Sequence, residues 1–288
     1  MHTMLNNELV QVRLYGGLGN QLFQFFAGLD LALKNGIPLH LDLSWLDEKW
    51  QSLNVFSDPA LKRLDFPIHL VNQPRTKFLD KTVGNRILRD LKIPAKISHI
   101  HVPKEVGFSE TYGLPKKIEL RGYYQSYIYL NRAKQEISLD AFLTDRAQSL
   151  EDKATKKIAV HIRGGDYLDL QGLYYKLDAD YYNKAVQVAR GTYPDLPVVV
   201  FTNDVEHAQF LLRNSSIEYS IFDDVAMDPQ EILENMSQSS AIIGANSTFS
   251  FWAGQKSGDN VPKIFPSKWF QRNPLPRMLY PSDWVILD

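Results

Sequence analysis

The chain has 288 residues, a length that suggests two compact units or one large one. Its 44% hydrophobic and 12% aromatic residues are typical of globular proteins and exclude collagen-like, disordered and coiled-coil chains. The 32 basic and 33 acidic residues nearly cancel, which argues against a nucleic acid as the main partner. The absence of cysteine excludes disulfides, zinc–thiolate sites and cysteine nucleophiles.

Nothing in the sequence predicts a transmembrane segment. Apolar runs such as Val198–Phe201 are far shorter than the roughly 20 residues that span a bilayer. Residues 1–11 lack the basic start and the apolar stretch of a secretory signal. We therefore expect a soluble intracellular α/β protein.

The first 43 residues predict a strand–helix–strand unit. Val10–Leu14 alternates like a strand and runs into Gly16 and Gly17. Leu22–Lys34 has apolar residues at helical spacing, and Pro38–Leu43 predicts a second strand. This order is typical of a parallel sheet.

The middle of the chain is harder to interpret. Between Ser44 and Val106 the pattern is weak and no element can be placed well. Lys116–Tyr124 contains a predicted strand, and Asn131–Asp152 predicts a helix that is polar on one side. A charged stretch at 151–157 then precedes a new start, so we place a domain boundary between residues 150 and 151.

The second half predicts strands and helices in alternation, which is the pattern of a second parallel sheet. The predicted strands are Lys157–Ile162, Val198–Phe201, Tyr219–Phe222 and Ser240–Gly244, and the predicted helices are Asp180–Arg190, Val205–Arg213 and Pro229–Ser237.

Four polar segments follow predicted strands, where an open α/β sheet binds its ligands. They are Gly16–Gln21, His161–Asp166, Phe201–Asp204 and Ala245–Trp252.

The first segment is a glycine turn that leads into a helix, where backbone N–H groups favour an anion. It is neither a Walker A loop nor the dinucleotide fingerprint. The alternative is a tight turn capped by Asn20.

In the second segment, strand alternation places His161 and Arg163 on one side, and Arg163 could clamp a phosphate. The alternative there is a buried His–Asp hydrogen bond that closes the loop.

The other two segments also have a structural alternative. Asn203 and Asp204 could bind a base or ribose, or one of them could cap the helix that follows. The segment from Asn246 onward could bind an oxyanion, or Asn246 or Ser247 could be an N-cap with core aromatics behind it. The sequence also disfavours a metal site, because its one D-x-D, Asp178-Ala-Asp180, lies at a helix start and its histidines are scattered.

Together these segments resemble glycosyltransferase family 11, the α-1,2-fucosyltransferases, in their order along most of the chain. The departure nearest to the site is Gly164, where the family usually has a second Arg. The resembling blocks are Gly16-Gly-Leu-Gly-Asn-Gln-Leu-Phe-Gln24, Gly122-Tyr-Tyr-Gln-Ser126, Val160-His-Ile-Arg-Gly-Gly-Asp-Tyr167, Phe201-Thr-Asn-Asp204, Ile243–Trp252 and Pro266-Ser-Lys-Trp269.

The resemblance implies a GT-B fold, with two Rossmann-like domains facing a cleft. Residues 1–150 would form the acceptor-side domain and residues 151–288 the GDP-fucose-binding domain. The implied reaction transfers fucose from GDP-β-L-fucose with inversion at the anomeric carbon. It forms an α-1,2 link, commonly to galactose O2, without a metal or other cofactor. Implied partners are GDP-fucose and an oligosaccharide acceptor of the O-antigen type, and no nucleic acid. The implied location is the cytoplasm, with peripheral contact to the inner face of the membrane if the acceptor is lipid-linked.

The motifs also imply roles for single residues. Because the leaving group is a diphosphate, Arg163 is the main candidate for stabilising its charge. Asn20 would reach the fucose or the β-phosphate, and Asp166 would be a base or a brace of the loop. The expected donor-binding residues are Gly17, Gly19, Asn20, His161, Arg163, Asn203, Asp204, Asn246, Ser247, Thr248 and Phe249, and the expected acceptor-binding residues are Tyr124, Gln125 and Ser126.

Two other functions stay open. The first is transfer from a different GDP-sugar, such as GDP-mannose, on the same fold. The second is a catalytically inactive module that binds a nucleotide or a glycan.

Overall fold

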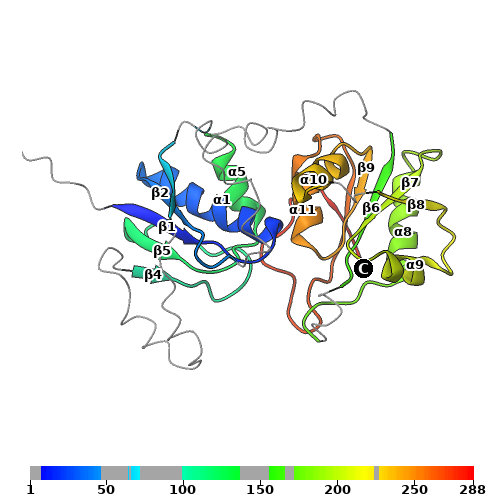
Figure 1. Cartoon of the computed structure of the whole chain (residues 1–288), viewed down its shortest axis with the longest axis horizontal. Helices are drawn as coiled ribbons and strands as arrows, with labels where there is room; N and C mark the ends of the chain where they lie inside the picture. Colours follow the sequence, from blue (N-terminus) through cyan, green and yellow to red (C-terminus); the bar gives the residue numbers. More distant parts are fainter. Residues whose placement is uncertain are drawn as a thin grey trace, which may run out of the picture. The chain divides into compact units, whose positions relative to one another are not determined.

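The computed structural model describes residues 8–46, 64, 66–71, 99–136, 156–165, 172–223 and 227–288. The chain divides into two compact units (Figure 1). Unit 1 contains residues 1–142 and 277–279, and unit 2 contains residues 143–276 and 280–288. The predicted boundary at residues 150 and 151 lies between 137 and 155, outside the described residues.

Unit 1 is built on a parallel sheet in the order β3-β2-β1-β5-β4. The βαβ prediction is confirmed, because Val10 of β1 lies in register with Leu39 of β2 in a parallel pair. Strands β3 and β4, in the region of weak pattern, were not predicted. The strands are β1 (Leu9–Arg13), β2 (Leu39–Asp42), β3 (Ile68–Val71), β4 (His99–His101) and β5 (Lys117–Leu120).

Helix α1 (Leu18–Asn35) is the central helix of unit 1 and packs beside α5 (Tyr127–Ala133), as Figure 1 shows. It ends at Gly36, whose left-handed backbone (φ 61°) stops the helix. Its predicted start at Leu22 was wrong. Gly17 is the N-cap and its carbonyl accepts from the N–H of Asn20 and Gln21, so the glycine segment forms the first helical turn.

Of the predicted helix Asn131–Asp152, residues 137–152 lie outside the described residues, and Asn131–Ala133 belong to helix α5. Helix α5 begins at Tyr127 because the hydroxyl of Ser126 accepts from the N–H of Ile128. The helix ends at Ala133, because Lys134, Gln135 and Glu136 are exposed and offer no apolar face to bury.

Unit 2 has a parallel sheet in the order β11-β10-β9-β6-β7-β8. Counted from β6, this is the order 3-2-1-4-5-6 of a Rossmann sheet. The edge strand β11 and its neighbour β10 were not predicted. The strands are β6 (Ile158–Ile162), β7 (Val198–Thr202), β8 (Tyr219–Ile221), β9 (Ala241–Ile243), β10 (Lys263–Pro266) and β11 (Val285–Leu287).

In the part of unit 2 that the structure describes, four helices accompany this sheet. Apolar side chains of α8 (Ala179–Arg190) and α9 (Val205–Leu212) form one core with inward residues of the strands, such as Val160 and Val200. Helix α10 (Pro229–Ser237) packs beside α11 (Thr248–Lys256) (Figure 1). The α/β class with two Rossmann-like units, the domain composition of the GT-B fold, is therefore confirmed.

Candidate functional site

The two sheets each have a point where the strand order reverses, and α/β sheets bind ligands at such points. In unit 2 this point lies between β6 and β9, and in unit 1 between β1 and β5. Three of the four predicted polar segments follow β6, β7 and β9, and the fourth follows β1. The structure therefore places each of the four predicted segments at the carboxyl edge of its own sheet.

His161 is the last but one residue of strand β6 and lies on the face opposite to α8. Its side chain is buried and its ring lies 5.7 Å from that of Phe249 in α11. Burial, with a smaller contribution from the charge of Arg163, lowers the pKa of His161 to about 3, so the ring is neutral at physiological pH. Its Nδ1 is buried and has no hydrogen-bond partner among the described residues. A ligand or water that reached this nitrogen would remove an unfavourable free energy of about 1–3 kcal/mol.

The loop after β6 is held by the residues that follow β7. The side chain of Asn203 accepts from the N–H of Gly164 (3.0 Å) and donates to its carbonyl (3.2 Å). The carboxylate of Asp204 accepts from the N–H of Gly165 at 3.0 Å. Gly165 has a left-handed backbone (φ 61°), which favours glycine. These contacts fix the backbone immediately after the half-buried Arg163.

Asp204 also caps α9, as one alternative predicted. Its other oxygen accepts from the N–H of His207 at 2.9 Å. Hydrogen bonding from the backbone of His207, and then from Gly165, lowers the pKa of Asp204. The carboxylate is therefore ionised at neutral pH and already makes two hydrogen bonds, and its contact with a nucleoside stays a prediction.

The same contacts account for glycine at position 164. A Cβ on Gly164 would lie 2.7 Å from Cβ of Asp204, closer than side-chain carbons approach. The loop of this chain therefore has no room for a second arginine in its present conformation.

The segment after β9 has a structural role. Asn246 is buried and its amide nitrogen donates to the carbonyls of Tyr175 (2.8 Å) and Trp269 (2.9 Å). Ser247 is the N-cap of α11, as one alternative predicted, and accepts from the N–H of Phe249 at 3.3 Å. Thr248 is buried and Phe249 is half-buried, whereas Phe251 and Trp252 belong to the core as predicted.

A pocket of about 210 Å³ lies at the β6–β9 point. Arg163 and Asn246 line it, together with Lys176 and His207, which the sequence did not single out. Lys176 lies in an irregular segment between β6 and α8 and does not directly follow a strand, so its place became visible only in three dimensions. The remaining lining residues are Ile162, Tyr174, Tyr175, Leu177, Asp178, Tyr182, Leu211 and Ala245.

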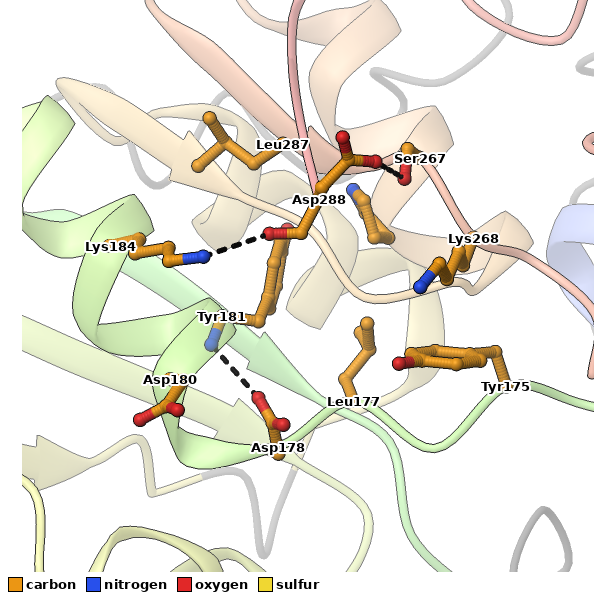
Figure 2. Close-up of a pocket in the computed structure, with 11 residues that line it drawn as sticks. Tyr175, Leu177, Asp178, Asp180, Tyr181, Lys184, Ser267, Lys268, Leu287 and Asp288 are labelled. Carbon is orange, nitrogen blue, oxygen red and sulfur yellow. Dashed lines mark hydrogen bonds between the residues drawn. The ribbon is translucent and has the colours of Figure 1, made fainter.

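A second pocket of about 180 Å³ shares Tyr175, Leu177 and Asp178 with the first (Figure 2). Its polar groups largely bind one another. Lys184 donates to the backbone oxygen of Asp288 at 3.4 Å, and the hydroxyl of Ser267 contacts the Asp288 side chain. Asp178 caps α8 by accepting from the N–H of Tyr181, which confirms the interpretation of the D-x-D as a helix start. The first pocket is therefore the better candidate for a ligand.

In unit 1, the glycine segment surrounds the start of α1. Gly16 has a left-handed backbone (φ 78°), and Gly17 is an N-cap without a side-chain cap. Asn20 is therefore not the cap that one alternative predicted. Gly19 is buried in the first turn, and Asn20 is half-buried beside it. The helix N-terminus adds partial positive charge at this place.

Glutamine side chains brace this segment. Gln24 is fully buried and exchanges two hydrogen bonds with the backbone of Tyr15 (3.0 and 3.2 Å). Gln21 donates to the carbonyl of Gly16 at 2.7 Å. These contacts fix the loop between β1 and α1, and the sequence did not predict them.

The residues after β5 lie against the same segment. Gln125 donates to Oδ1 of Asn20 at 2.9 Å, which brings two of the predicted motifs together. Tyr124 and Ser126 are buried: the Tyr124 hydroxyl contacts His101, and the Ser126 hydroxyl donates to the carbonyl of Met278 at 2.7 Å. These contacts support a structural role for both side chains, and acceptor binding by the three residues stays a prediction.

The exposed aromatic residue here is Tyr123, which the sequence did not single out. It is 38% exposed, and its ring meets that of Tyr15 edge-on at 5.1 Å.

Asp166, the predicted base or brace, lies outside the described residues. Within the described ranges, no three His, Asp or Glu side chains cluster as metal ligands would. No helix in that part of the chain has both the length and the apolar character to cross a membrane.

The chain is similar in sequence to known glycosyltransferases. An *Escherichia coli* α-1,2-colitosyltransferase is 27% identical over 304 residues, covering 98% of this chain and 99% of the relative. The *Escherichia coli* O-antigen biosynthesis glycosyltransferase WbnK is 25% identical over 321 residues, covering 95% and 99%. The crystal structure of the *Bradyrhizobium* fucosyltransferase NodZ is 14% identical, with a TM-score of 0.47, covering 87% of this chain and 93% of that one. The model of glycosyl transferase family 11 matches residues 77–288. The chain therefore belongs to glycosyl transferase family 11 and is a glycosyltransferase.

Proposed function

We propose that the protein is an inverting α-1,2-fucosyltransferase. It moves L-fucose from GDP-β-L-fucose to a glycan hydroxyl, galactose O2 in the simplest case, without a metal ion. The acceptor hydroxyl attacks the anomeric carbon, the bond to the β-phosphate oxygen breaks, and GDP leaves with its electron pair. The acceptor proton goes to a base or to water, and Asp166 is the candidate base.

One observation carries this proposal: a cationic pocket at the reversal point of a Rossmann sheet, with Arg163 on a braced loop. The leaving diphosphate gains negative charge in the transition state, and a fixed guanidinium stabilises that charge best when it needs no reorganisation. Lys176 lines the same pocket and supplies a second positive charge. This supports binding of the diphosphate between Arg163 and Lys176.

The other predicted residues have supporting roles in this proposal. His161 is neutral and binds through a ring nitrogen rather than as a charged group. Asn203 and Asp204 hold the loop that carries Arg163. In unit 1, Asn20 donates to an oxygen of the transferred sugar or of the β-phosphate, and the exposed ring of Tyr123 offers an apolar face to the acceptor.

A second donor, GDP-colitose, is favoured by the 27% identical relative named α-1,2-colitosyltransferase. Colitose is L-fucose without the 3-hydroxyl group. Sites that hydrogen-bond a hydroxyl reject the analogue that lacks it much more strongly than apolar sites reject an added hydroxyl. The ratio of kcat/KM values for the two donors therefore distinguishes the two functions.

The test is a transfer assay in EDTA with GDP-fucose, GDP-colitose and GDP-mannose, and acceptors that end in galactose. We expect transfer from GDP-fucose, a new α-1,2 linkage by NMR, and full activity with EDTA. Transfer from GDP-colitose alone would replace the donor assignment and leave the family chemistry intact. GDP binding without turnover on any acceptor would favour the inactive binding module.

A further inference from the structure

Asn20 and Gln125, which are 105 positions apart in the sequence, are joined by a hydrogen bond between their side chains. The Nε2 group of Gln125, in the loop after β5, donates to Oδ1 of Asn20, in the first turn of α1, at 2.9 Å. We propose that Gln125 is a positioning residue that orients the amide of Asn20, so that Nδ2 of Asn20 donates to a substrate oxygen. This inference rests on the proposed function.

The argument depends on the two ends of an amide side chain. Rotation of the Asn20 amide by 180° would exchange its donor and acceptor at little steric cost. The bond from Gln125 occupies the acceptor end, and Nδ2 has no hydrogen-bond partner among the described residues. Phosphate oxygens and the sugar ring oxygen only accept hydrogen bonds, so a substrate of this class needs the donor end.

The segment that carries Gln125 is fixed on both sides. Its own N–H donates to the carbonyl of Val106 at 2.7 Å, and Ser126 caps α5 directly after it. Before it, Tyr124 is fully buried with a left-handed backbone (φ 51°), which is uncommon for a large side chain. The backbone of Gln125 therefore cannot move with Asn20, and it provides a fixed reference for the amide.

The side chain of Gln125 is itself 6% exposed. Its Oε1 is buried, and no hydrogen-bond partner of this atom lies in the described part of the chain. Gly16 completes the arrangement. A Cβ there would lie 3.0 Å from Nδ2 of Asn20, so the glycine leaves the donor end uncovered.

The test is a double-mutant cycle with kinetic readouts. Gln125→Met keeps the length of the side chain and removes its donor, whereas Gln125→Glu keeps the shape and only accepts. We expect kcat to fall about tenfold for Gln125→Met, because one hydrogen bond is lost. The fall in kcat should be larger for Gln125→Glu. Its carboxylate would accept a hydrogen bond from Nδ2 of Asn20, and Oδ1 of Asn20 would then face the substrate. In an Asn20→Ala background, Gln125→Met should cost no further activity.

The matched control is Gln135→Met, the same change at an exposed position of unit 1. It should leave kcat, KM and the melting temperature unchanged. If Gln125→Met unfolds the protein, Gln125→Glu and Asn20→Asp, which retain the size of each side chain, take over the test.

Two outcomes separate this inference from the proposed function. A wild-type protein that transfers sugar, with Gln125→Met within twofold of its kcat or with losses that add to those of Asn20→Ala, would overturn the positioning role alone. A wild-type protein that transfers no GDP-sugar would refute the proposed function and the inference with it.

Discussion

Replacing Asn203 by Ala tests the brace of the loop that carries Arg163. The substitution removes two hydrogen bonds, of 3.0 and 3.2 Å, to the N–H and carbonyl of buried Gly164. At about 0.5–1.5 kcal/mol each, their loss should lower the free energy of unfolding by about 1–3 kcal/mol. If the same free energy holds the loop in its productive conformation, kcat/KM should fall roughly 5- to 150-fold.

The assay pairs transfer kinetics with urea unfolding of the same preparation. Asn214→Ala, the same change at an exposed residue after α9, is the control and should match the wild type in both. An Asn203→Ala variant with wild-type kcat/KM and a folded structure would show that the loop does not need this brace. The claim that Asn203 holds Arg163 in a productive position would then be wrong.

Three further predictions concern single positions in the two units. Gly164→Arg, which introduces the usual residue of the family, should lower activity rather than raise it, because its Cβ would lie 2.7 Å from Cβ of Asp204; a gain in kcat would refute this. Gly244→Ala should lower the free energy of unfolding by about 2 kcal/mol or more, measured in urea, because its Cβ would lie 2.0 Å from the ring of Phe265; wild-type stability would contradict it. Burial raises the pKa of Asp30 from 3.8 to about 6, so the folded state binds this proton more tightly than the unfolded state. The free energy of unfolding, relative to that of Asp30→Asn, should therefore fall by about 3 kcal/mol or less as pH rises from 4 to 7, and a rise over this range would refute the assignment.

Much of the second unit could be predicted from the sequence, because its strands are apolar and its helices begin at recognisable caps. Helix α10 was predicted at its observed bounds, where Pro229 follows the capping Asp228. The start of α1 could not be predicted in this way. Gly17 caps it without a side chain, so the sequence offers no polar cap and Gly19 suggests a loop.

The candidate site was predictable only in part, for a similar reason. His161 and Arg163 stand out because they follow an apolar strand. Lys176 lies in an irregular segment, and the contact between Asn20 and Gln125 joins residues far apart in the sequence. Local patterns carry no signal for such pairings, because they depend on the order of strands in the sheet.

The most direct measurement of the central claim is a calorimetric titration of GDP and GDP-fucose in EDTA, with the wild type, Arg163→Ala and Arg272→Ala. Arg272 is exposed in the same unit, so its variant controls for the loss of one positive charge. The account predicts that the wild type and Arg272→Ala bind both ligands. It also predicts that Arg163→Ala remains folded and loses most of its affinity for the diphosphate, with transfer reduced on the order of 10²–10³-fold. Unchanged GDP binding in Arg163→Ala, with transfer above about a tenth of the wild-type rate, would contradict it.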